Sequence, residues 1–232
     1  MQKNILKSQV VGLAPNSYLV KEYKKTLTKL SIVQFEAAIG LMLGDASLQT
    51  QNNGKTYRIK FEYGDKNKPY LDHIVNIFDE WILGKPHSKI RINHNNNLVK
   101  NWGIQTFSHE AFNVLCELFI INGKKGISEN LIKNHLTGSG LAYWFMDDGG
   151  KLDYNKNSKN NSVVLNTQSF SKLEVENMAF EISSKFKLEC SIRNNKGKQV
   201  IVISSSSYDS FFKIIEPYLI NDMKYKLPNF NK

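Results

Sequence analysis

Apolar and polar residues alternate along several segments of the chain, the pattern of strands with one face in a core and one in solvent. The strands predicted in this way span 57–63, 89–93, 98–107, 162–169, 190–194 and 199–204. Helical spacing of apolar residues predicts helices at 35–46, 70–83, 140–150 and 173–186, and within 104–122 and 203–221. The element order is close to α-β-β-α-β-β-α and occurs twice along the chain, which indicates an α+β fold. The basic side chains expected on solvated strand faces are Lys60, Arg91, Lys100 and Arg193.

The chain contains an internal repeat. The segment "IQTFSHEAFNVLCELFIIN" (104–122) aligns without a gap with "ISSSSYDSFFKIIEPYLIN" (203–221). Upstream in each half lies a short apolar segment that ends in acid, "FEAAIGLMLGDA" with Asp45 and "GLAYWFMDDGG" with Asp148. Downstream in each half lies a lysine, Lys125 and Lys226. Three matched features in the same order predict a duplication, with repeats at 35–136 and 137–232 after a basic arm at 1–34.

The two acid-terminated segments predict a pair of packed helices. In the first, the small residues Ala37, Gly40 and Gly44 recur at spacings of three and four, so one face carries almost no side chain and another helix can approach closely. If the two helices pack on each other, their C-terminal ends meet. Asp45 and Asp148 are then expected to be neighbours across a pseudo-two-fold axis.

Two carboxylates brought together in a partly buried place are costly unless a cation lies between them. An oxygen-rich site suits a hard cation, above all Mg²⁺, and the carbonyl groups at helix C-terminal ends favour a cation as well. We therefore expect two or more divalent ions, held by the side chains of Asp45 and Asp148 and the backbone carbonyls of Gly44 and Asp147. Such a site suits hydrolysis of a phosphodiester by an activated water.

The paired lysines are expected on either side of this site. Lys125 and Lys226 can neutralise developing phosphate charge and order the attacking water, although a lysine at its usual pKa of about 10.4 is a poor general base. Their neighbours Lys124 and Lys224 leave each assignment open by one or two residues. A duplicated site with two-fold character can act on two antiparallel strands, so a double-strand break is the expected product.

The composition indicates a polyanionic partner. Lysine and arginine number 31 against 21 acidic residues, which gives a formal net charge of +10 and an isoelectric point near 9.4. Lysine and asparagine are both abundant, as expected of AT-rich coding in an organellar genome. The lone residues Cys116 and Cys190 form no metal-binding or disulfide pattern, and no apolar run is long enough to span a membrane.

The segments "AIGLMLGDA" and "LAYWFMDDGG" resemble the paired signature helices of the LAGLIDADG homing endonucleases, in their single-chain, two-repeat form. The resemblance extends along nearly the whole chain, through the runs "PNS", "KEYK", "QTF", "LAYWFMDDGGK", "DYNKNS", "VLNTQSF" and "YKLPN". It implies a duplicated αββαββα fold whose two pseudo-two-fold-related halves each lay a saddle-shaped antiparallel sheet in a DNA major groove. Tyr143, where the family pattern has glycine, and Ala46 depart from the ideal signature.

The resemblance also implies an activity. Members of the family are intron-encoded endonucleases that cut one long, asymmetric DNA site on both strands and leave short 3′ overhangs. By motif alignment, the catalytic acids fall on Asp45 and Asp148 and the active-site lysines on Lys125 and Lys226. The chain would act on double-stranded DNA as a monomer, with no membrane association. It would be encoded by the mitochondrial genome and act in the mitochondrial matrix.

Positions that match the DNA-reading segments of the family lie in both halves. They are Lys89, Arg91, His94, Tyr154, Asn155, Lys156, Arg193, Asn195 and Lys196. Two alternatives remain beside the endonuclease. One is a maturase that binds intron RNA and assists splicing of a group I intron, and the other is a binding protein that has lost catalysis. The presence of both acids and both lysines argues against the second.

Overall fold

The computed structural model describes residues 5–92, 96–152 and 160–228. The chain forms two compact units, one made of residues 1–34 and 46–116 and the other of residues 35–45 and 117–232. The second unit therefore contains the first acid-terminated helix together with the whole of the second half of the chain. Helix α2 (Ile32–Leu43) begins in unit 1 and continues in unit 2, and α4 (Asn113–Phe119) does the same.

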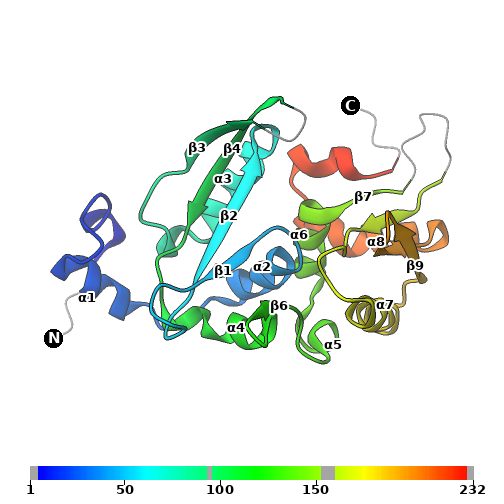
Figure 1. The fold of residues 1–232 in the computed structure, drawn as a ribbon, viewed down its shortest axis with the longest axis horizontal. Coiled ribbons are helices and arrows are strands. Elements are labelled where there is room, and N and C mark those ends of the chain that lie inside the picture. Colours follow the sequence, from blue (N-terminus) through cyan, green and yellow to red (C-terminus); the bar gives the residue numbers. More distant parts are fainter. Residues whose placement is uncertain (1–4, 93–95, 153–159, 229–232) are drawn as a thin grey trace. The chain divides into compact units, whose positions relative to one another are not determined.

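Unit 1 contains a four-stranded antiparallel sheet in the order β1-β2-β4-β3 (Figure 1). In chain order, with η marking a 3₁₀ helix, the elements of unit 1 are η1 (Lys7–Gln9), α1 (Tyr18–Thr26), β1 (Ser47–Gln49), β2 (Arg58–Gly64), η2 (Asp65–Asn67), α3 (Lys68–Ile77), η3 (Asp79–Trp81), β3 (His87–Ile92), β4 (Leu98–Gln105) and η4 (Glu110–Phe112). The alternating sequence of β2 buries Ile59, Phe61 and Tyr63 on one face. Helix α3 packs there, and the Tyr63 and Tyr70 rings lie 5.2 Å apart.

The described part of the predicted basic arm packs on unit 1. Ser17 caps α1 by accepting a hydrogen bond from the backbone of Val20, and Val20 and Tyr23 then form a small buried cluster with Val10. The Tyr23 hydroxyl donates to the carbonyl of Glu80 at 2.8 Å. One apolar face of α1 is thus covered, while Lys21 and Lys25 are exposed to solvent.

Unit 2 contains a second antiparallel sheet in the order β7-β8-β10-β9, the same order as in unit 1 once the strands are renumbered. Its elements are β5 (Ile120–Ile121), β6 (Lys124–Lys125), α5 (Leu131–His135), α6 (Gly138–Asp148), β7 (Gly149–Lys151), β8 (Val163–Leu165), α7 (Lys172–Phe186), β9 (Cys190–Asn195), β10 (Lys198–Ile203), η5 (Ser205–Ser207), α8 (Tyr208–Ile215), η6 (Glu216–Tyr218) and η7 (Asn221–Lys226). A capping box between Ser171 and Glu174 starts α7.

The observed order is α2-β1-β2-α3-β3-β4-α4 and then α6-β7-β8-α7-β9-β10-α8, so the predicted αββαββα fold is confirmed in both halves. Each four-stranded sheet lies wholly within one predicted repeat. Edge strands β1 and β7, which follow the two acids directly, were not among the predicted segments. Within the described ranges, no helix has the length and apolar character needed to cross a bilayer.

Candidate active site

The site lies where α2 and α6 pack against each other in unit 2, and Figure 1 shows the two helices side by side. A Cβ atom on Gly40 would lie only 2.1 Å from the carbonyl oxygen of Gly140 and 2.8 Å from Cβ of Tyr143. A Cβ atom on Gly44 would lie 2.4 Å from Cβ of Asp147. The two glycines therefore let the helix backbones touch, and no larger residue fits at either position without a shift of the partner helix.

The ends of the two helices meet at the acids. The backbone N–H of Asp45, just past the end of α2, donates a hydrogen bond to Oδ2 of the buried Asp147 at 3.1 Å. The carbonyl of Asp148, at the end of α6, accepts from the backbone and side-chain amides of Asn166 at 2.9 and 2.8 Å. The first bond joins the two helix ends, and the second fixes the end of α6 to the sheet.

Each half supplies one lysine to this cluster. Nζ of Lys125, on β6, donates to the carbonyl of Gly44 at 2.7 Å. Nζ of Lys226, on η7, donates to the carbonyl of Asp147. The two contacts are equivalent in the two repeats, because Gly44 and Asp147 both precede the acid of their signature segment. Of the lysines left open by the sequence, it is thus Lys125 and Lys226 that the structure brings to the acids, and Lys124 is exposed.

The electrostatics of the cluster follow from burial. Burial raises the pKa of Asp45, and the charges of Lys226 and Lys125 oppose this rise. Burial, and then repulsion from the Asp45 carboxylate, raise the pKa of Asp148 to about 6. Burial lowers the pKa of Lys125, although the three carboxylates around it work in the opposite direction. The carboxylates outnumber the ammonium groups, so the cluster attracts an additional cation.

The donor set fits the divalent ions expected from the sequence. Within the described ranges, no group of three or more histidine, cysteine, aspartate or glutamate side chains comes together as a metal site. The cluster here has another composition, because the carboxylates of Asp45 and Asp148 and the backbone carbonyls of Gly44 and Asp147 all offer oxygen atoms. Each carbonyl accepts a lysine hydrogen bond, and a carbonyl oxygen carries two lone pairs. Oxygen ligands alone suit a hard cation such as Mg²⁺ or Ca²⁺.

Two of the three predicted DNA-reading residues of the first half, Lys89 and Arg91, lie on the outer face of the unit 1 sheet. Lys89 and Arg91 stand opposite Asn101 and Val99 in the β3–β4 ladder, so their side chains share a face with the polar residues of β2. Both are exposed. Lys100 lies on the opposite face of the sheet. His94 lies outside the described residues.

In the second half, Arg193 and Asn195 lie on β9, and both are exposed. They are two residues apart and so share a face of the sheet, opposite Val200 and Lys198. Lys196 is at the tip of the β9–β10 turn with a positive φ of 52°. The remaining predicted contacts, Tyr154, Asn155 and Lys156, lie outside the described residues.

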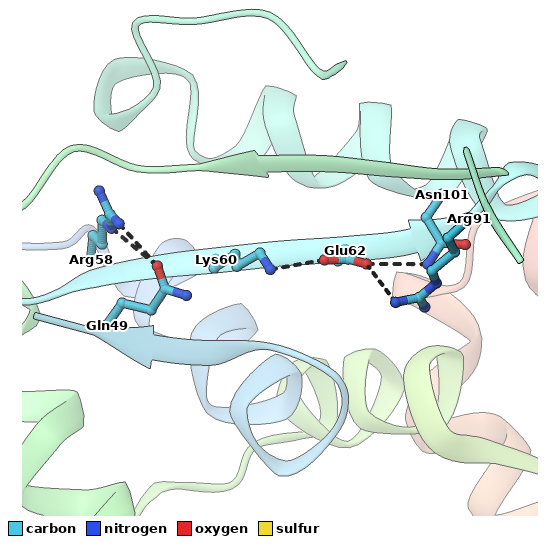
Figure 2. A network of polar contacts seen from close by, with 6 residues as sticks. All are labelled: Gln49, Arg58, Lys60, Glu62, Arg91 and Asn101. Carbon is cyan, nitrogen blue, oxygen red and sulfur yellow. Dashed lines mark hydrogen bonds and ion pairs between the residues drawn. The ribbon is translucent and has the colours of Figure 1, made fainter. Parts of the chain in front are cut away.

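Sequence reasoning missed Glu62, which lies among the basic residues of the first sheet (Figure 2). Its carboxylate contacts Lys60, Asn101 and Arg91. The alternation of β2 places Arg58, Lys60 and Glu62 on one polar face and could have identified the acid. Its partners on β3 and β4 depend on strand register, which no local pattern provides.

Comparison with known proteins agrees with this geometry. Residues 35–211 match the model of the LAGLIDADG DNA endonuclease family. The chain belongs to the LAGLIDADG DNA endonuclease family. A relative, "Probable intron-encoded endonuclease 1" of Wickerhamomyces canadensis, is 47% identical over 228 residues. The aligned residues make up 98% of this chain and 98% of that protein.

The fold of this LAGLIDADG protein also matches a solved structure, the homing endonuclease I-WcaI bound to its DNA recognition sequence. The TM-score is 0.92 at 46% identity, over 98% of this chain and 100% of that one. A more distant relative is the cytochrome b mRNA maturase bI2 of Debaryomyces hansenii. It is 29% identical over 202 residues, which make up 84% of this chain and 73% of the maturase.

Proposed function

We propose that this protein is a homing endonuclease that cuts both strands of one long, asymmetric DNA site and leaves 3′ overhangs. The observation that carries the proposal is the cluster at the helix ends, to which each repeat contributes one acid and one lysine. Its support from known proteins is I-WcaI, which is bound to its DNA recognition sequence and matches this chain in fold, with 46% sequence identity, over 98% of its length.

In this proposal Asp45 and Asp148 are the catalytic acids and hold two or more Mg²⁺ ions, with the carbonyls of Gly44 and Asp147 as further ligands. Bound ions of this kind lower the pKa of a coordinated water and stabilise charge on the phosphate. Lys125 and Lys226 each stand next to one of the two scissile phosphates. Their ammonium groups neutralise charge that develops on the phosphate oxygens and orient the attacking water.

The two sheets supply the DNA contacts. Lys89 and Arg91 in the first repeat (35–136), and Arg193, Asn195 and Lys196 in the second (137–232), contact bases and phosphates. Arginine and asparagine can make paired hydrogen bonds to base edges, whereas lysine more often holds phosphate. We place the protein in the mitochondrial matrix because its lysine- and asparagine-rich composition is that of an AT-rich organellar gene, and because the relative from Wickerhamomyces canadensis is named as intron-encoded.

A cleavage assay tests this function. Purified protein is incubated with Mg²⁺ and a supercoiled plasmid that carries an intronless rRNA gene, and in parallel with a plasmid library of randomised sites. We expect a discrete linear product with 3′ overhangs, and uncut DNA when EDTA is present. No cutting of any plasmid in the library would end the proposal, and cutting that resists EDTA would end its metal-dependent part.

A second candidate function is assistance of intron splicing, favoured by the similarity to a maturase. Its test is the splicing rate of a group I precursor RNA with and without the protein, at a Mg²⁺ concentration at which the RNA alone splices slowly. Faster splicing supports the maturase function, alone or beside DNA cleavage, and an unchanged rate with every precursor tested removes it.

A further inference from the structure

An acid occupies the centre of a surface that is otherwise suited to DNA. Glu62 lies on β2 between the basic residues of the outer sheet face, with its side chain about one third exposed (35%). A carboxylate at such a place repels phosphate and weakens the binding of any DNA. The unit 1 core does not need it, because the neighbours of Glu62 that face inward, Phe61 and Tyr63, are the ones that pack there.

The Glu62 carboxylate makes contacts with three strands (Figure 2). Oε2 accepts from Nζ of Lys60 on the same strand at 2.8 Å, and Oε1 accepts from Nδ2 of Asn101 on β4 at 3.2 Å. Nη1 of Arg91 on β3 lies 3.8 Å from the same Oε1. Two of these groups are hydrogen-bonded to Glu62 and the third, Arg91, is ion-paired with it, and all three are flexible side chains that could each make contacts with base edges or phosphates. Glu62 thus gathers all three side chains around one carboxylate.

We propose that Glu62 is a positioning residue for DNA specificity, which fixes Arg91 and Asn101 for base reading and lowers affinity for DNA of the wrong sequence. This inference rests on the proposed DNA-cutting function. Two effects combine. Fixed donors fit one pattern of base acceptors well and other patterns poorly, because each misplaced donor loses its hydrogen bond. The negative charge also reduces the phosphate attraction that all sequences share.

The test compares affinities for two duplexes, the one that the wild-type protein selects from the randomised library and a scrambled duplex of the same length. Glu62→Gln removes the charge, and Glu62→Asp keeps the charge but shortens the reach. We expect Glu62→Gln to bind the scrambled duplex more tightly than wild type and to lose about tenfold in the ratio of the two affinities. We expect Glu62→Asp to lose discrimination as well, without the gain in affinity for the scrambled duplex. Equal tightening for both duplexes in Glu62→Gln, with wild-type discrimination in Glu62→Asp, would overturn the positioning role.

Two further comparisons make the result specific. Asp72→Asn removes a charge and an ion pair to Lys68 on α3, which covers the inner face of the same sheet, and should leave the ratio of affinities unchanged. Glu62→Gln combined with Asn101→Ala should lose less discrimination than the sum of the two single losses, because Glu62 acts in part through Asn101; additive losses would contradict this. A wild-type protein that selects no duplex would instead refute the proposed function.

Discussion

Replacement of Asp148 by asparagine should stabilise the metal-free protein at neutral pH while it destroys the proposed site. Burial and the neighbouring Asp45 raise the pKa of Asp148 from its ordinary 3.8 to about 6, so ionisation of this carboxyl group opposes folding. A group whose pKa is raised on folding contributes most stability when it is protonated. That contribution is complete below the unfolded-state pKa of 3.8 and is lost as the pH rises through about 6.

The magnitude follows from the shift of about two pKa units. Compared with an aspartate whose pKa is the same in both states, the raised pKa of Asp148 lowers the free energy of unfolding by about 1 kcal/mol near pH 4.5 and by about 3 kcal/mol above about pH 7. Because asparagine keeps the shape and cannot ionise, the variant should exceed wild type by up to these amounts. Urea unfolding in EDTA at about pH 4.5 and about pH 8 measures the difference. Asp222→Asn, at an exposed carboxylate, is the control and should differ little from wild type. A variant no more stable than wild type at the higher pH would refute the reasoning.

Three further predictions concern the site. Gly40→Ala should destabilise the protein by about 1–3 kcal/mol or more, measured by urea unfolding, because its methyl group would overlap the backbone of Gly140; wild-type stability would exclude the close contact. Asp45→Asn should abolish cleavage in the plasmid assay and retain DNA binding in a gel-shift assay, and cleavage at the wild-type rate would remove that acid from its assigned role. Lys226→Met should slow single-turnover cleavage by about 100-fold without loss of binding, whereas Lys224→Met should not; the reverse result would move the role to Lys224.

The repeated features of the sequence were sufficient for the fold and for the centre of the candidate site. The similar spacing of acid and lysine in the two halves, 80 and 78 residues, depends on no local propensity, so it predicts the meeting of Asp45 and Asp148 wherever the two signature helices pack. The contact between the lysines and the carbonyls of Gly44 and Asp147 was not predicted. It depends on where β6 and η7 end in space, which is a tertiary property.

Element boundaries were less well predicted, although one signal was present. Helix α2 begins at Ile32 and not at Phe35. The reason is a reciprocal pair in which Gln34 N–H donates to Oγ of Ser31 at 3.2 Å and Ser31 N–H donates to Oε1 of Gln34 at 3.0 Å. The sequence "SIVQ" carries this capping-box signature. Strands β1 and β7, by contrast, have three residues each, too few for an alternating pattern to be recognised.

The sequence pattern also did not predict which face of the first sheet each basic residue lies on. Alternation predicted solvated positions for Lys60, Arg91 and Lys100 but not that Lys100 lies on the opposite face from the other two. Only the register of β4 against β2 and β3 decides this, and register is set by the packing of the whole face.

The central claim is that aspartates from two repeats share divalent ions at the meeting point of two helices. It is tested most directly by a crystal structure of the protein with its target DNA and Ca²⁺, in which anomalous scattering locates the ions. The account predicts Ca²⁺ within about 2.3–2.6 Å of carboxylate oxygens of both Asp45 and Asp148, next to a DNA phosphate. Ions bound to only one of the two aspartates, or found away from both, would contradict it.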